Sequence, residues 1–396
     1  MRVVLTPLAR TMIADRIKNV KDSGTMKMKE LAGQKKAEGK KIISFTVGEP
    51  DFDTPKHVVE AAKKALDEGK TRYLNGPGLP ELREAIAKRS KADNGIPCDS
   101  SNVIVTPTKQ AIFETIMATV NPGDEVIMPD PAWVSYEPCA ALAGGRAVPA
   151  VTSEETEFRL LPETVAELIT PKTKMILLNS PSNPCGSVAT KEDIKGIADL
   201  AKDHDLVVLS DEVYEKIVFD GLKHYSIAAE PGMFDRTVTI SGFSKTYAMT
   251  GWRLGWLVAP KPLFKAIGKV QQHSITHATT FAQYGGLAAL TSSQDCVKAM
   301  VKEFSERRDL IMKLIKDIPQ LHCDKPKGAF YVFPRYEGKM DSETMALSLM
   351  DKAEVALTGG ASFGAAGEQH LRISYATGKK NIEEGMVRLK KAFDGM

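Results

Sequence analysis

The sequence predicts an α/β protein, with a large domain built on a mostly parallel sheet and a smaller α+β domain after it. Two observations support this prediction. Short apolar runs alternate with helix-like segments, and the runs are continuously apolar, as expected of strands buried on both faces. Strands joined by helices imply parallel neighbours with right-handed crossovers. The runs are NVIVT (102–106), EVIMP (125–129), RAVPAVT (146–152), KMILLN (174–179), LVVLS (206–210) and TVTIS (237–241).

Length and composition fit a globular protein with a sizeable core. The chain has 396 residues, 43% of them hydrophobic, and a formal net charge of +3, which suits two domains. Basic clusters such as residues 35–41 are interleaved with Glu and Gly, so we interpret them as solvated surface rather than a nucleic-acid site. No apolar run is long enough to cross a bilayer, and MRVVLTPLAR does not resemble a signal peptide. We therefore expect a cytoplasmic protein that binds neither nucleic acid nor membrane.

The cysteines are scattered along the chain and odd in number. Such a pattern is typical of free thiols in a reducing compartment, and it contains no CxxC pair of the kind that holds a metal. We therefore expect neither disulfides nor a metal site. The cysteines are Cys98, Cys139, Cys185, Cys296 and Cys323.

The N-terminal part of the sequence predicts an arm and a peripheral helix. Residues 11–38 are charged and helix-permissive, and the pattern ends at Gly39. An apolar strand at residues 42–47 then breaks into the loop GEPDFDTP. Gly48 in this loop has no side chain, so the backbone there could approach a ligand closely. An ordinary strand-to-helix turn explains the loop equally well.

Helices are expected between and after the strands. Thr190 is a good N-cap for one of them, because its side chain can accept a hydrogen bond from the first turn. The predicted helices lie at 57–68, from 80, 109–120, 134–143, 162–169, 190–204, 264–272, 280–290, 297–315, 344–352 and 381–393, with further strands at 328–334 and 370–376. We expect residues 1–57 to form an arm and helix that pack with the small domain, residues 58–290 the large domain, and residues 291–396 the small C-terminal domain.

Polar side chains follow five of the apolar runs, at the point where each run ends. In sheets of this kind ligands bind beyond the carboxyl ends of the strands. Any one of the loops is explained as a turn, but five together indicate a binding site. The loops are TPTKQ (106–110), DPAW (130–133), SPSNPCG (180–186), DEVY (211–214) and GFSK (242–245).

Lys245 lies in the segment SGFSKTYAMTGWRLGW, directly after an apolar run. Lysine is the side chain that forms Schiff bases with carbonyl compounds. Ser244 and Arg253 are close enough in sequence to converge with it on one anion. A lone loop lysine is more often solvated, so the neighbouring loops decide between the two interpretations.

The five loops fit a flat heteroaromatic aldehyde that carries a phosphate. Lys245 would bond the aldehyde carbon, and Asp211, at the end of a buried strand, would keep a ring nitrogen protonated. Tyr214 and Asn183 would donate to a phenolate oxygen on the ring. Taken singly, Asp211 and Asn183 are also explained as turn or cap residues.

The other loops would hold the ring face and the phosphate. Trp133 offers a flat apolar surface for stacking, although it could also be a core aromatic residue. Thr108 and the amides that open the helix after it could bind the phosphate, helped by Ser244 and Arg253. Arg253 alone would be explained as half of a surface ion pair.

Four motifs stand in the order and at the spacings of one family: SPSNPCG, SDEVYE, SGFSKTYAMTGWRLGW and LRISYAT. The sequence resembles the aspartate aminotransferase family, in its prokaryotic branch, among the fold type I pyridoxal phosphate enzymes. The resemblance runs from VGEPDFDTP (47–55) to LRISYAT (371–377). SKxxxMxGWRxG is a specific signal, whereas NPxG alone would be weak. The resemblance implies a mostly parallel seven-stranded sheet in the large domain, which binds pyridoxal 5'-phosphate.

The resemblance also implies roles for individual residues. Lys245 is the Schiff-base lysine and the proton shuttle, Asp211 lies at the pyridine nitrogen, and Tyr214 at the ring oxygen. The implied cofactor site consists of Tyr73, Thr108, Lys109, Trp133, Asn183, Asp211, Tyr214, Ser244, Lys245 and Arg253, and the implied substrate site of Gly48, Lys109, Trp133, Asn183 and Arg372. Arg372 would hold the substrate's α-carboxylate. A homodimer is implied, in which Tyr73 reaches the cofactor phosphate of the neighbouring subunit.

The sequence departs from the family pattern at two places. TPTKQ has no glycine and is one residue shorter than the usual phosphate loop. The family pattern therefore does not fix the roles of Thr108 and Lys109. The family's NPTG is NPCG here, which leaves Asn183 in place.

The expected activity is transfer of the amino group from L-aspartate to 2-oxoglutarate by a ping-pong mechanism. This reaction would belong to amino-acid metabolism. An acidic substrate needs a second cation, for which Lys109 is the first candidate and Lys21 the second. Lys109 could instead face solvent in the first helical turn. Alanine, an aromatic amino acid or prephenate are alternative substrates, and a lyase or decarboxylase on the same fold is an alternative reaction. A cofactor-dependent regulator would need an added DNA-binding region.

Overall fold

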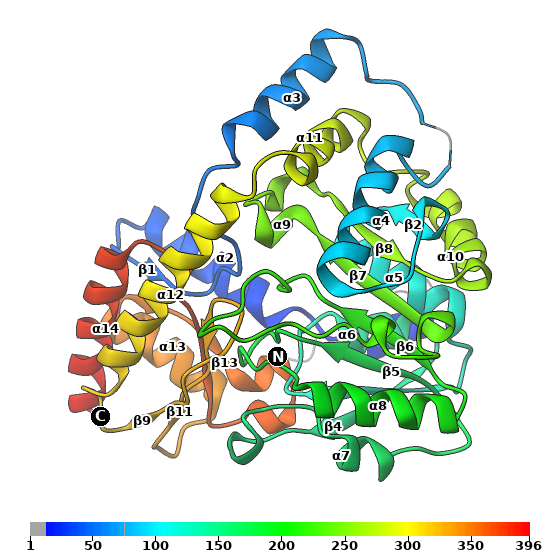
Figure 1. The fold of residues 1–396 in the computed structure, drawn as a ribbon. Coiled ribbons are helices and arrows are strands. Elements are labelled where there is room, and N and C mark those ends of the chain that lie inside the picture. Colours follow the sequence, from blue (N-terminus) through cyan, green and yellow to red (C-terminus); the bar gives the residue numbers. More distant parts are fainter. Residues whose placement is uncertain (1–12, 75) are drawn as a thin grey trace.

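The computed structural model describes residues 13–74 and 76–396, and its centre is a seven-stranded sheet (Figure 1). The strand order is β2-β8-β7-β6-β5-β3-β4, in which β8 is antiparallel to both of its neighbours and the pairs from β7 to β4 are parallel. The strands are β2 (Val103–Val105), β3 (Glu125–Asp130), β4 (Arg146–Val151), β5 (Thr173–Asn179), β6 (Val207–Asp211), β7 (Thr237–Gly242) and β8 (Gly255–Val258). The predicted α/β fold with a mostly parallel seven-stranded sheet is confirmed.

All six predicted apolar runs form strands, and β8 is the strand that the sequence did not predict individually. Its first two residues, Gly255 and Trp256, end the motif around Lys245, and all four residues of the strand are buried. Because β7 and β8 are antiparallel neighbours, the chain between them forms a loop at the sheet edge, and this loop carries Lys245 and Arg253.

Helices cover both faces of the sheet, which explains why the strands are continuously apolar. On β5, Met175 and Leu177 belong to the core beneath the helices α5, α6 and α10, whereas Ile176 and Leu178 belong to the core beneath α7 and α8. These helices are α5 (Thr108–Thr119), α6 (Tyr136–Leu142), α7 (Pro162–Ala166), α8 (Lys191–Asp203) and α10 (Lys261–Ser274). The predicted N-cap of α8 is confirmed, because Thr190 Oγ1 accepts from the Asp193 amide at 3.1 Å.

Three other helices also belong to the region of the large sheet. They are α3 (Lys56–Asp67), α4 (Pro80–Asn94) and α11 (Thr280–Thr291). The helix α11 packs against both α3 and α4, and α3 and α11 lie side by side at the top of Figure 1.

The smaller α+β part has a three-stranded sheet in the order β10-β14-β13, two short paired sheets and three helices. Its elements are β9 (Leu321–His322), β10 (Tyr331–Val332), β11 (Arg335–Tyr336), β12 (Val355–Ala356), β13 (Thr358–Gly359), β14 (Leu371–Ser374), α12 (Asp295–Ile315), α13 (Ser342–Ala353) and α14 (Lys379–Asp394). The predicted bounds at residues 57 and 290 stay a prediction.

The N-terminal segment joins this smaller part. The strand β1 (Ile43–Ser44) pairs in parallel with β12, and the helix α2 (Gly24–Ala37) packs against β12 and β13. The predicted strand at 42–47 is therefore much shorter in the structure, and residues 1–12 of the predicted arm lie outside the described residues. Within residues 13–74 and 76–396, none of the helices combines the length and apolar composition of a membrane span.

Candidate active site

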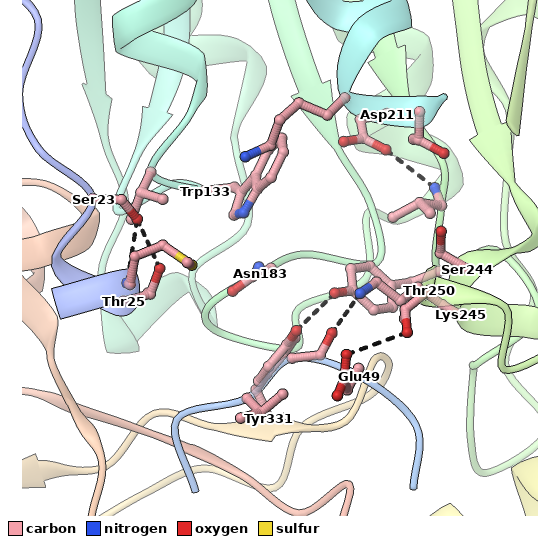
Figure 2. A pocket seen from close by; sticks show the side chains of 18 of the residues that line it. Ser23, Thr25, Glu49, Trp133, Asn183, Asp211, Ser244, Lys245, Thr250 and Tyr331 are labelled. Carbon is pink, nitrogen blue, oxygen red and sulfur yellow. Dashed lines mark hydrogen bonds between the residues drawn. The ribbon is translucent and has the colours of Figure 1, made fainter. Parts of the chain in front are cut away.

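A cavity of about 430 Å³ lies at the carboxyl edge of the large sheet, where all five predicted loops meet (Figure 2). The smaller α+β part and the N-terminal segment close its other sides. From the loops come Thr108, Lys109, Trp133, Asn183, Asp211, Tyr214, Ser244 and Lys245, and Arg253 follows the last loop. Residues outside the loops include Ser23, Thr25, Met26, Lys29, Thr46, Gly48, Glu49, Tyr136, Tyr331 and Arg372. Sequence motifs thus identified most of one wall but not the wall formed by residues 23–29.

Lys245 lies on the short helix α9 (Phe243–Thr246) directly after β7. Its Nζ donates a hydrogen bond to the backbone oxygen of Gly48. A side chain at Gly48 would collide with the Tyr331 hydroxyl, so glycine is required there. Removal of the amine from water, together with the charges of Arg372 and Arg253, lowers the pKa of Lys245 to about 8. Such an amine exchanges a proton readily near neutral pH.

Asp211 is the last residue of β6, and only 3% of it is exposed. Its carboxylate accepts hydrogen bonds from the Tyr136 hydroxyl at 2.8 Å and the Val213 amide at 3.2 Å. Burial nevertheless raises the pKa of Asp211 to about 6. A buried carboxylate of this kind gains from a cationic partner. Tyr136 was missed by the sequence analysis, and its place three residues after Trp133 was the available signal.

Arg372 lies on β14 and is 3% exposed. Its Nη1 donates to Asn183 Oδ1 at 3.0 Å and its Nη2 to the backbone oxygen of Thr46 at 2.6 Å. The guanidinium carbon lies 4.7 Å from the ring centres of both Tyr331 and Phe363. Among the described residues no group accepts a hydrogen bond from its buried Nε. These contacts fix the guanidinium at the cavity, and Nη1 and Nη2 each carry a second N–H that can donate to a carboxylate.

Asn183 and Tyr214 enter the cavity from the exits of β5 and β6. The backbone amide of Asn183 donates to Asn179 Oδ1 at 2.9 Å, which holds its loop. The hydroxyl groups of Tyr214 and Tyr331 are 2.7 Å apart. Burial raises the pKa of Tyr214 well above its ordinary value, so this hydroxyl keeps its proton and can donate it in a hydrogen bond.

Thr108 begins α5, and the N-terminus of this helix faces the cavity. A Cβ on Gly255 would lie 2.9 Å from the Thr108 amide nitrogen and 3.0 Å from the Ser241 oxygen, and one on Gly242 would collide with Thr108 Oγ1. Two strand glycines therefore allow the close approach that the glycine-free TPTKQ loop cannot provide itself. Ser244 also lines the cavity. A helix N-terminus of this kind is suited to an anion.

Arg253 and Lys109 supply cations at the same end of the cavity. Arg253 is exposed, and its Nη1 donates to the Thr250 oxygen at 2.8 Å. Lys109 Nζ lies 4.8 Å from the ring centre of Trp133. Partial removal of its amine from water and the nearby charge of Arg253 lower the pKa of Lys109. Lys109 lines the cavity, but it is also exposed to solvent, as one interpretation of the sequence allowed.

Two residues named by the sequence analysis do not line this cavity. Tyr73 is 87% exposed and forms a T-shaped contact with His277, with ring centres 5.7 Å apart. Lys21 is also exposed, and its Nζ donates to Glu137 at 3.0 Å. The predicted reach of Tyr73 into a neighbouring subunit stays a prediction.

Comparison with known proteins gives a consistent result. The family model "Aminotransferase class I and II" matches residues 40–389. An aspartate aminotransferase of Pyrococcus abyssi is 46% identical, with 96% of this chain and 97% of that one covered. An aromatic-amino-acid aminotransferase of Thermococcus litoralis is 44% identical, with 96% and 97% covered. The structure of the aspartate aminotransferase from Thermus thermophilus with maleate superposes with a TM-score of 0.91 at 38% identity, covering 96% of this chain and 99% of that one.

Proposed function

The chain belongs to the class I and II aminotransferases, and from this membership we propose that it is a pyridoxal 5'-phosphate enzyme that transfers the amino group of L-aspartate to 2-oxoglutarate. The products are oxaloacetate and L-glutamate. The observation that carries the proposal is the single cavity in which Lys245, Asp211 and Arg372 meet from three separate elements.

The residues of the cavity fit this cofactor. Asp211 is a buried carboxylate that would accept a protonated ring nitrogen, and Tyr214 keeps a proton for the ring oxygen, beside Asn183. When bound, the cofactor supplies an aldehyde for the amino group and a ring that withdraws electrons from the substrate. Trp133 lines the same cavity and would stack against that ring.

The phosphate would be held at the other end of the cavity. The amides that open α5, the Thr108 and Ser244 hydroxyls and the Arg253 guanidinium all line this end. Because Gly242 and Gly255 let the helix N-terminus lie directly against β7 and β8, its amides are in place before an anion binds.

The protein's own part in the reaction is to orient the substrate and move one proton. Arg372 would bind the α-carboxylate through its guanidinium, which Asn183 and Thr46 already hold in position. This contact fixes the direction of the substrate's Cα–H bond. Lys245 Nζ, with a pKa of about 8, would take the proton from the substrate's Cα and deliver it to the cofactor carbon that comes from the aldehyde. After one oxo acid leaves, a second one is aminated by the same steps in reverse.

A dicarboxylic substrate is supported by the remaining cation and by the relatives. Lys109 lines the cavity near Trp133 and is free to meet a distal carboxylate. The Thermus structure holds maleate, which is a dicarboxylate of aspartate's chain length. The aromatic-amino-acid relative supports the alternative, because Met26 and Trp133 place apolar surface at the same cavity.

A homodimer with shared sites is part of the proposal. Tyr73 is a large, exposed aromatic residue outside its own chain's cavity, as expected of a side chain that completes another copy's site.

Absorbance of the protein loaded with pyridoxal 5'-phosphate tests the proposal. Addition of L-aspartate alone should convert the bound cofactor once and then stop, and 2-oxoglutarate should restart turnover. Lys245→Ala should lose turnover by at least about a thousandfold, while Lys63→Ala, which changes an exposed lysine on α3, should be unaffected. Continuous consumption of one amino acid without an oxo acid would indicate a lyase, and undiminished transamination by Lys245→Ala would exclude the assigned role.

A further inference from the structure

Glu212 follows Asp211 at the end of β6, and its carboxylate is buried on the side away from the cavity. Only 1% of the residue is exposed. The carboxylate is bound by His224 Nε2 at 2.9 Å, the Ser226 hydroxyl at 2.7 Å and the Ser210 hydroxyl at 3.0 Å. Two buried carboxylates thus stand at adjacent positions, and neither the proposed cofactor nor the substrate would contact Glu212.

His224 is the cation that faces Glu212. Its side chain is 5% exposed. Burial alone would lower the pKa of His224, but Glu212, and more weakly Glu215, raise it above the ordinary value against the opposing effect of Lys216. When His224 is protonated, its charge balances that of the Glu212 carboxylate, so the pair has a net charge close to zero.

The charge of Glu212 matters for Asp211. The groups that act on the Asp211 carboxyl are Tyr136 on α6, the Val213 amide, Lys245 on α9 and Glu212, and Glu212 is the one that disfavours ionisation electrostatically. An unbalanced Glu212 would add to the effect of burial, because like charges at close range oppose each other's ionisation.

We propose that His224 is a positioning residue for the transamination: by pairing with Glu212 it cancels the negative charge beside Asp211 and keeps Asp211 ionised for a cationic ring nitrogen. This inference rests on the proposed function, since the ring nitrogen is what gives the Asp211 carboxylate its partner. His224 itself contacts neither substrate nor cofactor in this arrangement. The network also ties the segment that carries His224 and Ser226 to β6, so a merely structural role is the competing explanation.

The charge of Asp211 can be measured on the protein without cofactor. Asp211→Asn removes one titrating group, so the difference in unfolding free energy between this variant and the parent, followed by urea unfolding from pH 4 to 8, reports the pKa of Asp211. The measurement is made in four backgrounds: the native chain, His224→Gln, Glu212→Gln/His224→Gln and Ser226→Ala.

His224→Gln keeps a hydrogen-bond donor towards Glu212 but removes the positive charge, so it should move the pKa of Asp211 upward by about one unit. Ser226→Ala deletes a hydrogen bond to the same carboxylate without changing charge and should leave that pKa in place. The double variant removes both charges and should return the pKa to the native value or below it.

Equal pKa values of Asp211 in His224→Gln and the native chain would overturn the proposal and leave His224 a structural tie. If His224→Gln does not fold, His224→Asn takes its place, because it also removes the positive charge while keeping a hydrogen-bond donor, and an unchanged pKa of Asp211 in that variant overturns the proposal as well. Neither result depends on turnover, so failure of the proposed function would appear separately, as absence of transamination in the native enzyme.

Discussion

The ionised carboxylate of Asp211 destabilises the folded protein, and its proposed function explains why it is present. Its pKa of about 6 in the folded protein exceeds the value of 3.8 expected of an unperturbed Asp. A raised carboxyl pKa means that the folded state binds the proton more tightly, so the group favours folding below about pH 4 and this contribution is lost as pH rises through about 6.

Asp211→Asn should therefore stabilise the cofactor-free protein at pH 7, by roughly 3 kcal/mol, because each pKa unit corresponds to about 1.4 kcal/mol. The Tyr136 hydroxyl can accept from the new amide, so its hydrogen bond persists. The gain should vanish near pH 4, and urea unfolding at both pH values measures it. The same variant should lose transamination, and a stability gain that is equal at pH 4 and pH 7 would refute the electrostatic explanation.

Lys109→Ala tests which of the two candidate cations, Lys109 or Lys21, binds the distal carboxylate of the substrate. If Lys109 binds the distal carboxylate, kcat/KM for L-aspartate should fall about 10- to 100-fold, the loss of one charge-assisted hydrogen bond, while kcat/KM for L-alanine changes little. Lys21→Ala is the matched control, because Lys21 is exposed and paired with Glu137. Equal losses for aspartate and alanine would mean that Lys109 serves the cofactor instead.

Residue positions were predictable where a motif fixes them relative to a strand end. Lys245, Asp211 and Asn183 lie where the strand-exit pattern placed them. Tyr331 and Thr46 were not foreseen, because they reach Tyr214 and Arg372 through tertiary packing that leaves no local pattern.

At the scale of elements, the contact between α5 and the strands β7 and β8 places the proposed phosphate site. The helix can begin against the sheet only because Gly242 and Gly255 have no side chains there. TPTKQ itself contains no glycine, and the structure supplies glycine from two strands far along the chain. Such compensation between segments cannot be inferred from one loop.

Gly255→Ala should push the N-terminus of α5 away from the sheet, because the added Cβ meets backbone atoms that cannot rotate aside. We expect pyridoxal 5'-phosphate to bind at least about tenfold more weakly and the protein to lose about 1 to 3 kcal/mol of stability. Fluorescence titration and urea unfolding measure the two effects.

Gly268→Ala is the control for this change. Gly268 lies inside α10, where a Cβ would meet only Ile104 Cδ1 at 4.0 Å. That variant should keep cofactor affinity and gain up to about 1 kcal/mol of stability. Equal cofactor affinity in the two variants would show that the contact with Thr108 does not shape the phosphate site.

The alternation of strands and helices was predictable because burial on both faces leaves continuous apolar runs. The strand at 42–47 was only partly correct: an apolar run does not reveal its partner, and β1 pairs with β12 for two residues rather than joining the large sheet. β8 escaped individual prediction because its four residues merge with a glycine-rich motif.

At the scale of the whole molecule, the proposed dimer makes a complementation test possible. Tyr73→Ala and Lys245→Ala homodimers should each be impaired. After their subunits exchange in equal amounts, half of the dimers are hybrids with one intact site each, so about a quarter of native activity should return. Analytical ultracentrifugation verifies the exchange of a tagged subunit. If activity does not return although hybrids form, Tyr73 does not act across the interface.

Contacts between subunits were the feature that was hardest to predict from the sequence. No spacing in one chain records which residues of a second copy lie near it, and the role of Tyr73 came from family resemblance alone. Its exposure of 87% agrees with that role but does not identify its partner.

The path of the N-terminal segment sets a limit on how far the chain can be shortened. Ser23 and Thr25 line the cavity, Thr46 holds Arg372, and Gly48 holds Lys245. None of these residues belongs to the large sheet. A shortened chain could therefore keep that sheet and still lose the contacts that position Arg372 and Lys245. Expression designs that trim or replace the N-terminus should therefore keep the chain from Ser23 onwards. Several residues between 23 and 29, and residues 46–49, line the cavity.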